Sequence, residues 1–318
     1  MERNISLDIL KLLMAFMVVG IHTTFLIDIS PLLSAVTVEG LFRIAVPMFL
    51  LINGYFFYDS VQGGKSSTWF KRVAILYIIW MAIYSPFWFD TSNFDINWIK
   101  RFINQVVLGF FHLWYISGML FAAAALIVIR RFPPYLLISI VVITFISGVI
   151  IQYLGNYHVF ENTKFDTIAN KPWYHRNGLF TSLPFFLLGY LLRQAQTPKK
   201  MSLSQVRLGI FIGLALLVSE SLMNFAFHTL DEGIDNIFSS IILCPLLFIY
   251  FIKLNISGNT KNIALYASSI YFIHFFVMLI INKNLEITNT LNTLIVLLAS
   301  AALSYFLIMI NRKVKYIL

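Results

Sequence analysis

The sequence predicts an all-α polytopic membrane protein with about ten transmembrane helices and both termini in the cytoplasm. Three observations predict this class. Apolar residues make up 59% of the chain and charged residues only 12%, which is about half the charged fraction of a soluble domain. Apolar runs long enough to cross a bilayer recur from one end of the chain to the other. The basic residues between these runs fall mainly on alternate sides.

Hydropathy and turn residues place ten candidate helices along the chain. Their approximate ranges are 6–27, 40–58, 72–89, 110–129, 134–153, 178–194, 205–226, 234–252, 262–282 and 290–310. Residues 94–108 are predicted as a short amphipathic or interfacial helix before the fourth span, and the longest polar connection is 155–177. No internal repeat divides the chain, so we treat residues 1–318 as a single membrane domain.

The charge distribution orients the predicted helices. With the N-terminus in the cytoplasm, fifteen of the 23 lysine and arginine residues lie in inner segments, and this bias fits the positive-inside rule. A net charge of +9 does not indicate nucleic-acid binding here, because the basic residues are dispersed over many loops. The single cysteine, Cys244, excludes an intrachain disulfide framework and a cysteine-based metal site.

The first predicted helix carries ionisable residues inside an apolar run. Lys11 and His22 are eleven residues apart, so on a helix they share one face and lie about 16 Å apart along the axis. Asp8 lies one turn before Lys11, near the cytoplasmic end. Ionisable side chains along one face of a membrane helix cost free energy in lipid unless that face lines a polar path. Two structural alternatives remain open: His22 as a helix-packing residue, and Lys11 reaching the inner interface through its long side chain.

Polar groups from several other helices fall at the same depth as His22, in the outer half of the membrane. Each contributing helix has one histidine, arginine or glutamate in this layer. These residues are His22, Arg43, His112, Arg176, Glu220 and His274. Isolated charges at this depth cost a few kcal/mol each, so we expect these groups to line one cavity open to the outside. The open alternatives are interfacial anchors for the arginines and an aromatic belt for His112 with Trp114 and Tyr115.

This arrangement suits acyl transfer to an alcohol. His22 would take a proton from a hydroxyl, Arg43 and His112 would stabilise an oxyanion, and Glu220 would orient an imidazole or hold a sugar hydroxyl. The sequence has no P-loop, no HExxH and no GxSxG in a fitting context, so it does not indicate ATP hydrolysis, zinc proteolysis or a serine hydrolase. We expect no metal site.

The acyl donor would be a cytoplasmic, polyanionic thioester. Lys11 and basic loop residues such as Lys71, Arg72 and Arg130 would meet its phosphates around the inner mouth of the path. The acyl group would then cross the membrane while the nucleotide stays inside.

Five motifs, in order, resemble those of acyltransferase family 3, and the resemblance runs from about residue 6 to the last helix. Lysine at the first position is a variant of the commoner arginine, and Asn53 replaces the usual serine. The motifs are Lys11 through His22, Arg43 through Tyr55 with Val46-Pro47 and Gly54, His112-Leu113-Trp114-Tyr115, Arg176-Asn177-Gly178-Leu179-Phe180 followed by Pro184 and Gly189, and Ser269 through His274 with Tyr271.

The resemblance implies a ten-helix O-acyltransferase of the bacterial inner membrane. It would use acetyl-CoA as co-substrate, with no bound cofactor, to modify a cell-surface glycan or its lipid-linked precursor. Many members carry an attached extracytoplasmic esterase-like domain; the sequence has none, so we expect direct transfer or a separate partner. The site residues that we assign on these grounds are His22, Arg43, His112 and Glu220 for catalysis, Asp8, Lys11 and Arg72 for the donor, and Trp114, Tyr115, Arg176, Asn177 and His274 for the acceptor.

Two other functions were weighed. A subset of the family, fused to amino-acid racemase domains, is thought to import serine, and in that case the cavity would be a solute path with Lys11 as a gate. A structural subunit of a polysaccharide assembly complex would leave the buried charges unexplained.

Overall fold

The computed structural model describes residues 3–90, 95–227, 233–314 and 316–318. Helices dominate it, and two short strands, β1 (Arg3–Asn4) and β2 (Ser257–Gly258), pair antiparallel. The helices are α1 (Ser6–His22), α2 (Pro31–Thr37), η1 (Leu41–Ile44), α3 (Ala45–Gln62), α4 (Ser66–Ile83), α5 (Ser85–Trp88), α6 (Ile96–Leu108), η2 (Phe111–Leu113), α7 (Trp114–Ile129), α8 (Pro134–Asn156), α9 (Lys164–Ala169), α10 (Pro172–His175), η3 (Gly178–Ser182), α11 (Leu183–Gln194), α12 (Thr197–Lys200), α13 (Leu203–Phe227), α14 (Ser240–Leu254), α15 (Asn262–Asn284) and α16 (Asn289–Lys313).

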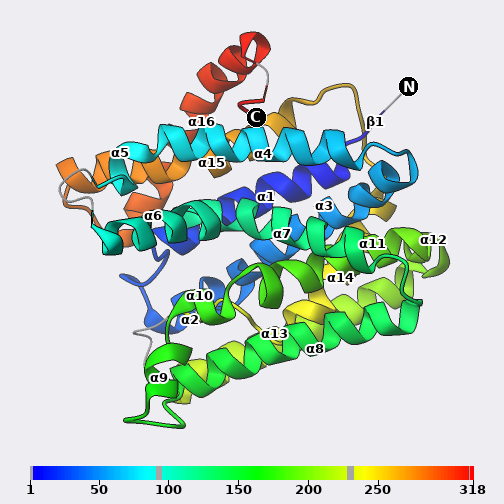
Figure 1. Cartoon of the computed structure of the whole chain (residues 1–318), viewed down its shortest axis with the longest axis horizontal. Helices are drawn as coiled ribbons and strands as arrows, with labels where there is room; N and C mark the ends of the chain where they lie inside the picture. Colours follow the sequence, from blue (N-terminus) through cyan, green and yellow to red (C-terminus); the bar gives the residue numbers. More distant parts are fainter. Residues whose placement is uncertain (1–2, 91–94, 228–232, 315) are drawn as a thin grey trace.

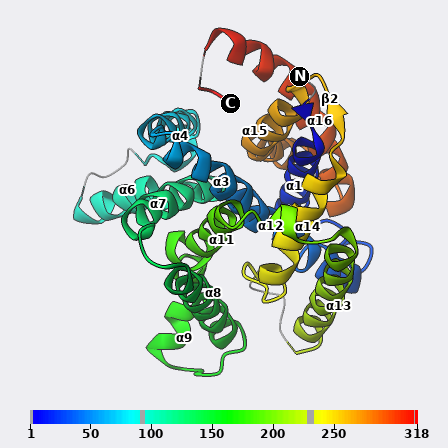
Figure 2. The same cartoon turned by 90° about the vertical axis from the view of Figure 1, so that its right-hand side faces the viewer.

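The long helices lie side by side along the longest axis of the molecule (Figure 1). Seen along that axis in Figure 2, α3 and α11 occupy the centre, α1, α15 and α16 lie on one side of them, and α8 lies on another. The short helices α2, α9 and α10 gather at the end of the array where α1 finishes (Figure 1). We refer to this end, where α1, α8 and α13 end and α3, α7 and α14 begin, as the His22 end.

The all-α class predicted from the sequence is confirmed. Each of the ten predicted ranges overlaps a long helix: α1, α3, α4, α7, α8, α11, α13, α14, α15 and α16. In the described part of the chain, six helical segments are long and apolar enough to cross a membrane: Pro31–Gln62, Phe111–Ile129, Pro134–Asn156, Leu203–Phe227, Asn262–Asn284 and Asn289–Lys313. The chain is therefore a multi-pass membrane protein, while ten crossings and cytoplasmic termini stay predictions.

Three predicted boundaries differ from the structure. The first helix ends at His22 instead of residue 27, because Thr23 turns away to bond Thr293 of α16, with the hydroxyl oxygens 2.6 Å apart. The eighth helix begins at Ser240 instead of residue 234. Residues 233–239 are not helical, because side chains of other segments form hydrogen bonds with their backbone. The interfacial helix is α6, from Ile96; residue 94 of that prediction lies outside the described residues.

The centre of the array is a close crossing of α3 and α11. A Cβ added at Gly54 would meet the backbone carbonyl of Phe186, and one added at Gly189 would meet the carbonyl of Leu51. Small residues let two membrane helices approach to backbone contact. Leu50 and Phe185, next to this crossing, are fully buried. The two helices therefore form a tightly packed unit.

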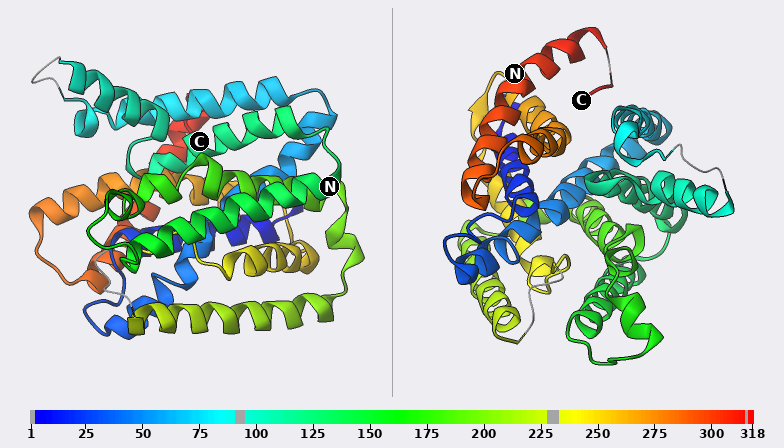
Figure 3. Two further views of the ribbon diagram at one scale, coloured as in Figure 1. Left: turned by 60° about the horizontal axis from the view of Figure 1, so that its bottom comes forward. Right: turned by 90° about the vertical axis from the view of Figure 1, so that its left-hand side faces the viewer.

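Large apolar side chains cover the outward faces of the peripheral helices. On α13 and α16, Phe211 and Leu298 are each 72% exposed, and α8 exposes Ile143 in the same way. Figure 3 shows these helices on the outside of the array, seen from two further sides. An exposed apolar surface of this extent is expected where lipid chains cover the protein.

Candidate active site

Three histidines from three helices meet at the His22 end. His22, in the last turn of α1, stacks on His274 of α15, with ring centroids 5.3 Å apart. His112, in η2, meets His274 edge-on at 5.1 Å. His112 and His274 are buried, whereas His22 is partly exposed. The structure thus brings together the three histidines that the sequence placed at one depth, and His22 is the one that a substrate can reach.

The tautomer of His274 is fixed by its hydrogen bonds. Its Nδ1 lies 2.7 Å from the carbonyl oxygen of Tyr271 and 3.2 Å from that of Ile270. Carbonyl oxygens only accept, so Nδ1 carries the proton and Nε2 presents a lone pair. Within the described residues neither this Nε2 nor either ring nitrogen of His112 has a hydrogen-bond partner. Buried polar atoms without partners are uncommon in proteins and are typical of functional sites.

Two arginines and two carboxylates form a network beside the histidines. Arg43 donates to Glu39, four residues earlier in the chain, and to Asp235, at 2.8 Å. Arg176 donates to the same oxygen of Asp235 at 3.2 Å, and its guanidinium lies 5.2 Å from the ring centroid of Trp114. Each arginine charge is thereby matched by a carboxylate, as a low-dielectric site requires.

The electrostatics of Asp235 follow from this network. Burial by itself would raise the pKa of the Asp235 carboxyl, but the guanidinium groups of Arg176 and Arg43 outweigh burial and hold the pKa below its usual value. The carboxylate therefore stays ionised at neutral pH and keeps both arginines in place.

The segment 233–239 that carries Asp235 is held by side chains instead of by secondary structure. Gln152 of α8 accepts from the backbone N–H groups of Asp235 and Asn236 at 2.8 Å, and it donates to the carbonyl of Asn236 at 2.9 Å. Glu39 accepts from the N–H of Ile234 at 3.0 Å. Irregular backbone within a membrane protein needs such internal partners.

Glu220, predicted as a catalytic residue, forms hydrogen bonds with this same segment. Its carboxylate accepts from the backbone N–H groups of Phe238 at 2.5 Å and Ser239 at 2.9 Å, just before α14, and from the hydroxyl of Tyr153. Both oxygens are occupied, and none of these partners is a histidine. The geometry is that of a structural residue that anchors the start of α14.

We expect Glu220→Ala to lower the free energy of unfolding by about 1.5–3 kcal/mol, the range for hydrogen bonds to a charged group. Glu220→Gln retains one accepting oxygen and should recover most of this loss. Thermal unfolding in detergent measures the effect, with the exposed Glu286→Ala as the matched control. Full stability of Glu220→Gln together with lost transfer activity would instead assign the carboxylate to the chemistry.

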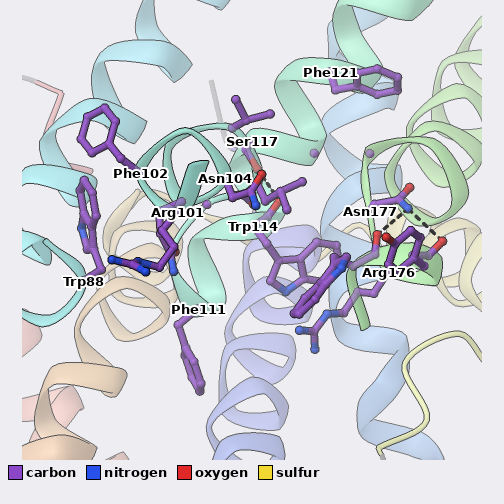
Figure 4. A pocket seen from close by; sticks show the side chains of 18 of the residues that line it. Trp88, Arg101, Phe102, Asn104, Phe111, Trp114, Ser117, Phe121, Arg176 and Asn177 are labelled. Carbon is purple, nitrogen blue, oxygen red and sulfur yellow. Dashed lines mark hydrogen bonds between the residues drawn. The ribbon is translucent and has the colours of Figure 1, made fainter. Parts of the chain in front are cut away.

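A cavity of about 1020 Å³ adjoins the cluster through Phe111, and none of the three histidines is among the residues of its wall (Figure 4). Its wall includes Phe111, whose ring lies 4.7 Å from that of His22, and Trp114 with Arg176. The opposite wall is formed by α6 and the residues just before it, which contribute Arg101, Asn104 and a group of aromatic rings. Aromatic faces interspersed with a few polar groups are typical of sites for small organic ligands.

The predicted acceptor residues divide between this cavity and the packed interior. Trp114, Arg176 and Asn177 line the cavity. Asn177 also caps η3 by accepting from the N–H groups of Leu179 and Phe180. Tyr115 and His274 lie inside the array of helices. Tyr115 is buried and its hydroxyl accepts a hydrogen bond from Asn53 at 2.8 Å, and His274 belongs to the histidine cluster.

The predicted donor residues lie on two helices, α4 and α1. Arg72 and Lys71 of α4 line a second cavity, of about 640 Å³, with Asn311 of α16 and the chain end at Leu318. Lys11 and Asp8 lie on α1 and are not part of its wall. Among the described residues, no group of three or more His, Cys, Asp or Glu side chains is arranged to hold a metal ion.

Comparison with known proteins gives a family and a set of relatives. The family model described as an acyltransferase domain matches residues 4–309. An amino-acid racemase of Enterococcus faecalis is 24% identical over 99% of this chain and 47% of its own length. A serine/alanine racemase of Enterococcus gallinarum is 26% identical over 69% of this chain and 33% of its own. The chain spans about half or less of the length of these curated relatives. No solved structure matches it.

Proposed function

Because the chain belongs to the acyltransferase family whose model covers residues 4–309, we propose that it is a membrane O-acetyltransferase. It moves an acetyl group from cytoplasmic acetyl-CoA to a hydroxyl of a cell-surface glycan or its lipid-linked precursor, on the outer side of the bacterial inner membrane. The observation that carries the proposal is the histidine cluster, whose partly exposed member His22 contacts Phe111, a residue of the wall of the larger cavity.

The proposed reaction has one transfer step. The acceptor hydroxyl gives its proton to His22, and the acceptor oxygen forms a bond to the acyl carbon. The C–S bond of the thioester breaks, and the proton on His22 passes to the departing CoA thiolate. Neutral His274, stacked on His22, holds that ring flat against α15.

The oxyanion that develops on the acyl oxygen in this step needs a hydrogen-bond donor. His112 is the candidate that the geometry favours, because both of its ring nitrogens lack partners in the described part of the chain. Arg43, which the sequence also suggested, uses both terminal nitrogens to bind Glu39 and Asp235. In the proposal Arg43 therefore fixes the shape of the site and supplies positive potential near the acyl oxygen.

A solute transporter is the second candidate, since relatives of this chain are described as amino-acid racemases. In that case the cavity would hold a small amino acid, whose carboxylate needs an uncompensated cation. Arg43 and Arg176 are already matched by Glu39 and Asp235. The cavity, at about 1020 Å³, is at the upper end of the range for drug-sized ligands. Both features favour the transferase.

One experiment separates the two. Purified protein in lipid nanodiscs is given radiolabelled acetyl-CoA and saccharides extracted from the host envelope, and CoA release and acetylated product are measured. The proposal requires both. Counterflow of serine in proteoliposomes, without CoA release, would establish the transporter in its place.

The second cavity gives a prediction about the donor. We expect Arg72→Ala and Lys71→Ala each to raise the KM for acetyl-CoA up to about fivefold with little change in kcat, because an exposed cation–phosphate contact contributes up to about 1 kcal/mol. Lys65→Ala, a nearby exposed lysine outside the cavity wall, is the matched control. Steady-state kinetics with varied acetyl-CoA measure the effect. Unchanged KM in both variants would place the donor elsewhere.

A further inference from the structure

The larger cavity is not uniform in chemistry. Around Arg101, Asn104 and Arg176 its wall is polar and carries indole rings. At Val107, Phe121 and Leu179 its wall is apolar, and these three side chains are exposed. In Figure 4, Phe121 lies on the far side of the cavity from Phe111, the residue that contacts His22. The cavity wall therefore has a polar part, at Arg101, Asn104 and Arg176, and an apolar part, at Val107, Phe121 and Leu179.

The apolar part lies at membrane depth. Phe121 is ten residues into the segment Phe111–Ile129, which is long and apolar enough to cross a bilayer. At 1.5 Å per residue this places Phe121 about 15 Å along the helix, roughly the middle of a 30 Å hydrocarbon core. Phe121 is also 48% exposed. An exposed cavity wall at this depth is open to lipid chains instead of water.

Helix α6, which closes the other side of the cavity, faces lipid as well. Its outward residues Ile96, Ile99, Ile103 and Val107 follow helical spacing on one face and are 45–65% exposed. Arg101, Asn104 and Gln105 lie on another face, toward the cavity. This division is typical of a helix that lies in the membrane interface with its apolar face among the acyl chains. Val107, at the end of this apolar face, is also part of the cavity wall.

We infer that this cavity takes a saccharide that is still attached to a membrane lipid. The saccharide lies in the polar part, where its ring faces pack on the indoles, and one of its hydroxyls reaches His22 past Phe111. The lipid chain leaves through the opening between Val107, Phe121 and Leu179 into the bilayer. This inference rests on the proposed function and selects the lipid-linked precursor over the free glycan as the acceptor.

The aromatic side chains support a saccharide in the polar part. Trp98 and Phe102 of α6 stack with centroids 5.2 Å apart and an interplanar angle of 13°, and Trp88 lies 5.9 Å from Phe102. All three line the cavity. Flat aromatic faces carry partial negative charge, which attracts the polarised C–H groups of a sugar ring. Asn104 and Asn177 can bond hydroxyls that project sideways.

The test compares two substitutions on the same helix. Val107→Trp narrows the proposed opening, whereas Ile103→Trp, one turn earlier and similarly exposed, lies outside the cavity wall. Transfer of radiolabelled acetyl is measured in nanodiscs with two acceptors: lipid-linked saccharides extracted from host membranes, and the same saccharides released by mild acid. CoA release without acceptor is recorded alongside.

The wild-type protein is expected to prefer the lipid-linked acceptor by at least about tenfold in kcat/KM, which burial of two CH₂ groups suffices to give. Val107→Trp should remove most of this preference, and Ile103→Trp should behave as wild type. Equal use of both acceptors by the wild type, or equal effects of the two tryptophans, would overturn the inference and leave the transferase intact. Absence of CoA release and of transfer to either acceptor would overturn the proposed function itself.

A second measurement does not depend on turnover. A diazirine-bearing polyprenyl phosphate in the same nanodiscs should label peptides that contain Val107, Phe121 or Leu179, and excess unlabelled polyprenyl phosphate should suppress the labelling. Labelling spread evenly over the lipid-exposed faces of α8 and α13 would contradict the proposed opening.

Discussion

Replacing His22 by alanine is expected to lower acetyl transfer by about 10²–10⁴-fold, the range for removal of a general base. His22 is the partly exposed member of the histidine cluster and adjoins Phe111 in the cavity wall. No hydrogen bond is found between its ring and another described residue, and its ring contacts are those with His274 and Phe111, so we expect the variant to fold. The loss should therefore appear in kcat, with thermal stability and acetyl-CoA binding close to those of the wild type.

The measurement is single-turnover transfer of radiolabelled acetyl to saccharide acceptors. His158→Ala is the control, because this histidine is 49% exposed and pairs with Asp166 away from the cluster. His274→Ala should also impair transfer, but it removes a buried ring bonded to the backbone of α15 and should lower stability as well. Near-normal product from His22→Ala would remove this residue from the chemistry.

Asp235→Ala is expected to have the largest effect on stability, about 3–5 kcal/mol, because it leaves Arg43 and Arg176 without their shared carboxylate. Activity should fall with it, since Arg176 would lose its position over Trp114. Asp59→Ala is the matched control: Asp59 also pairs with an arginine, Arg193, but it is 48% exposed, so its loss should cost at most about 1 kcal/mol.

Chemical or thermal unfolding in detergent compares these two variants, and pH adds a further check. Because the folded-state pKa of Asp235 is lowered, its stabilising contribution is complete above the ordinary pKa of 3.8 and declines as the pH falls through the lower folded value. The stability gap between wild type and Asp235→Asn should therefore narrow only below about pH 4. A gap that is constant down to that range and beyond would show that the charge of Asp235 is not what matters.

The sequence was sufficient for the helices and for the histidines. Long apolar runs with turn residues between them place every long helix, since hydrophobic length is a local property. His22, His112 and His274 were found because ionisable groups are rare in apolar helices and matching depth can be counted along each one. Arg43 and Arg176 were found in the same way.

The hydrogen-bond and ion-pair partners of the site residues were less predictable from the sequence. Glu39 precedes Arg43 by four residues, a spacing that favours an ion pair on a helix and was a usable signal. Asp235 and Gln152 gave no such signal, because their contacts join segments 83 residues apart in the chain. Glu220 was assigned to catalysis from its depth and from a weak motif similarity at Glu220-Ser221; two of its partners are backbone groups of a non-helical segment, which hydropathy does not reveal.

The glycine contacts between α3 and α11 have a mechanical consequence. Arg43 lies in η1, which leads directly into α3, and Arg176 precedes η3, which leads into α11. Where Gly54 and Gly189 let the two backbones touch, one helix cannot slide or tilt past the other without a steric clash. The guanidinium groups of Arg43 and Arg176 are therefore expected to move together with the rigid pair of α3 and α11. We therefore expect the two charges to keep one arrangement during the reaction, and any movement to occur in helices outside this pair.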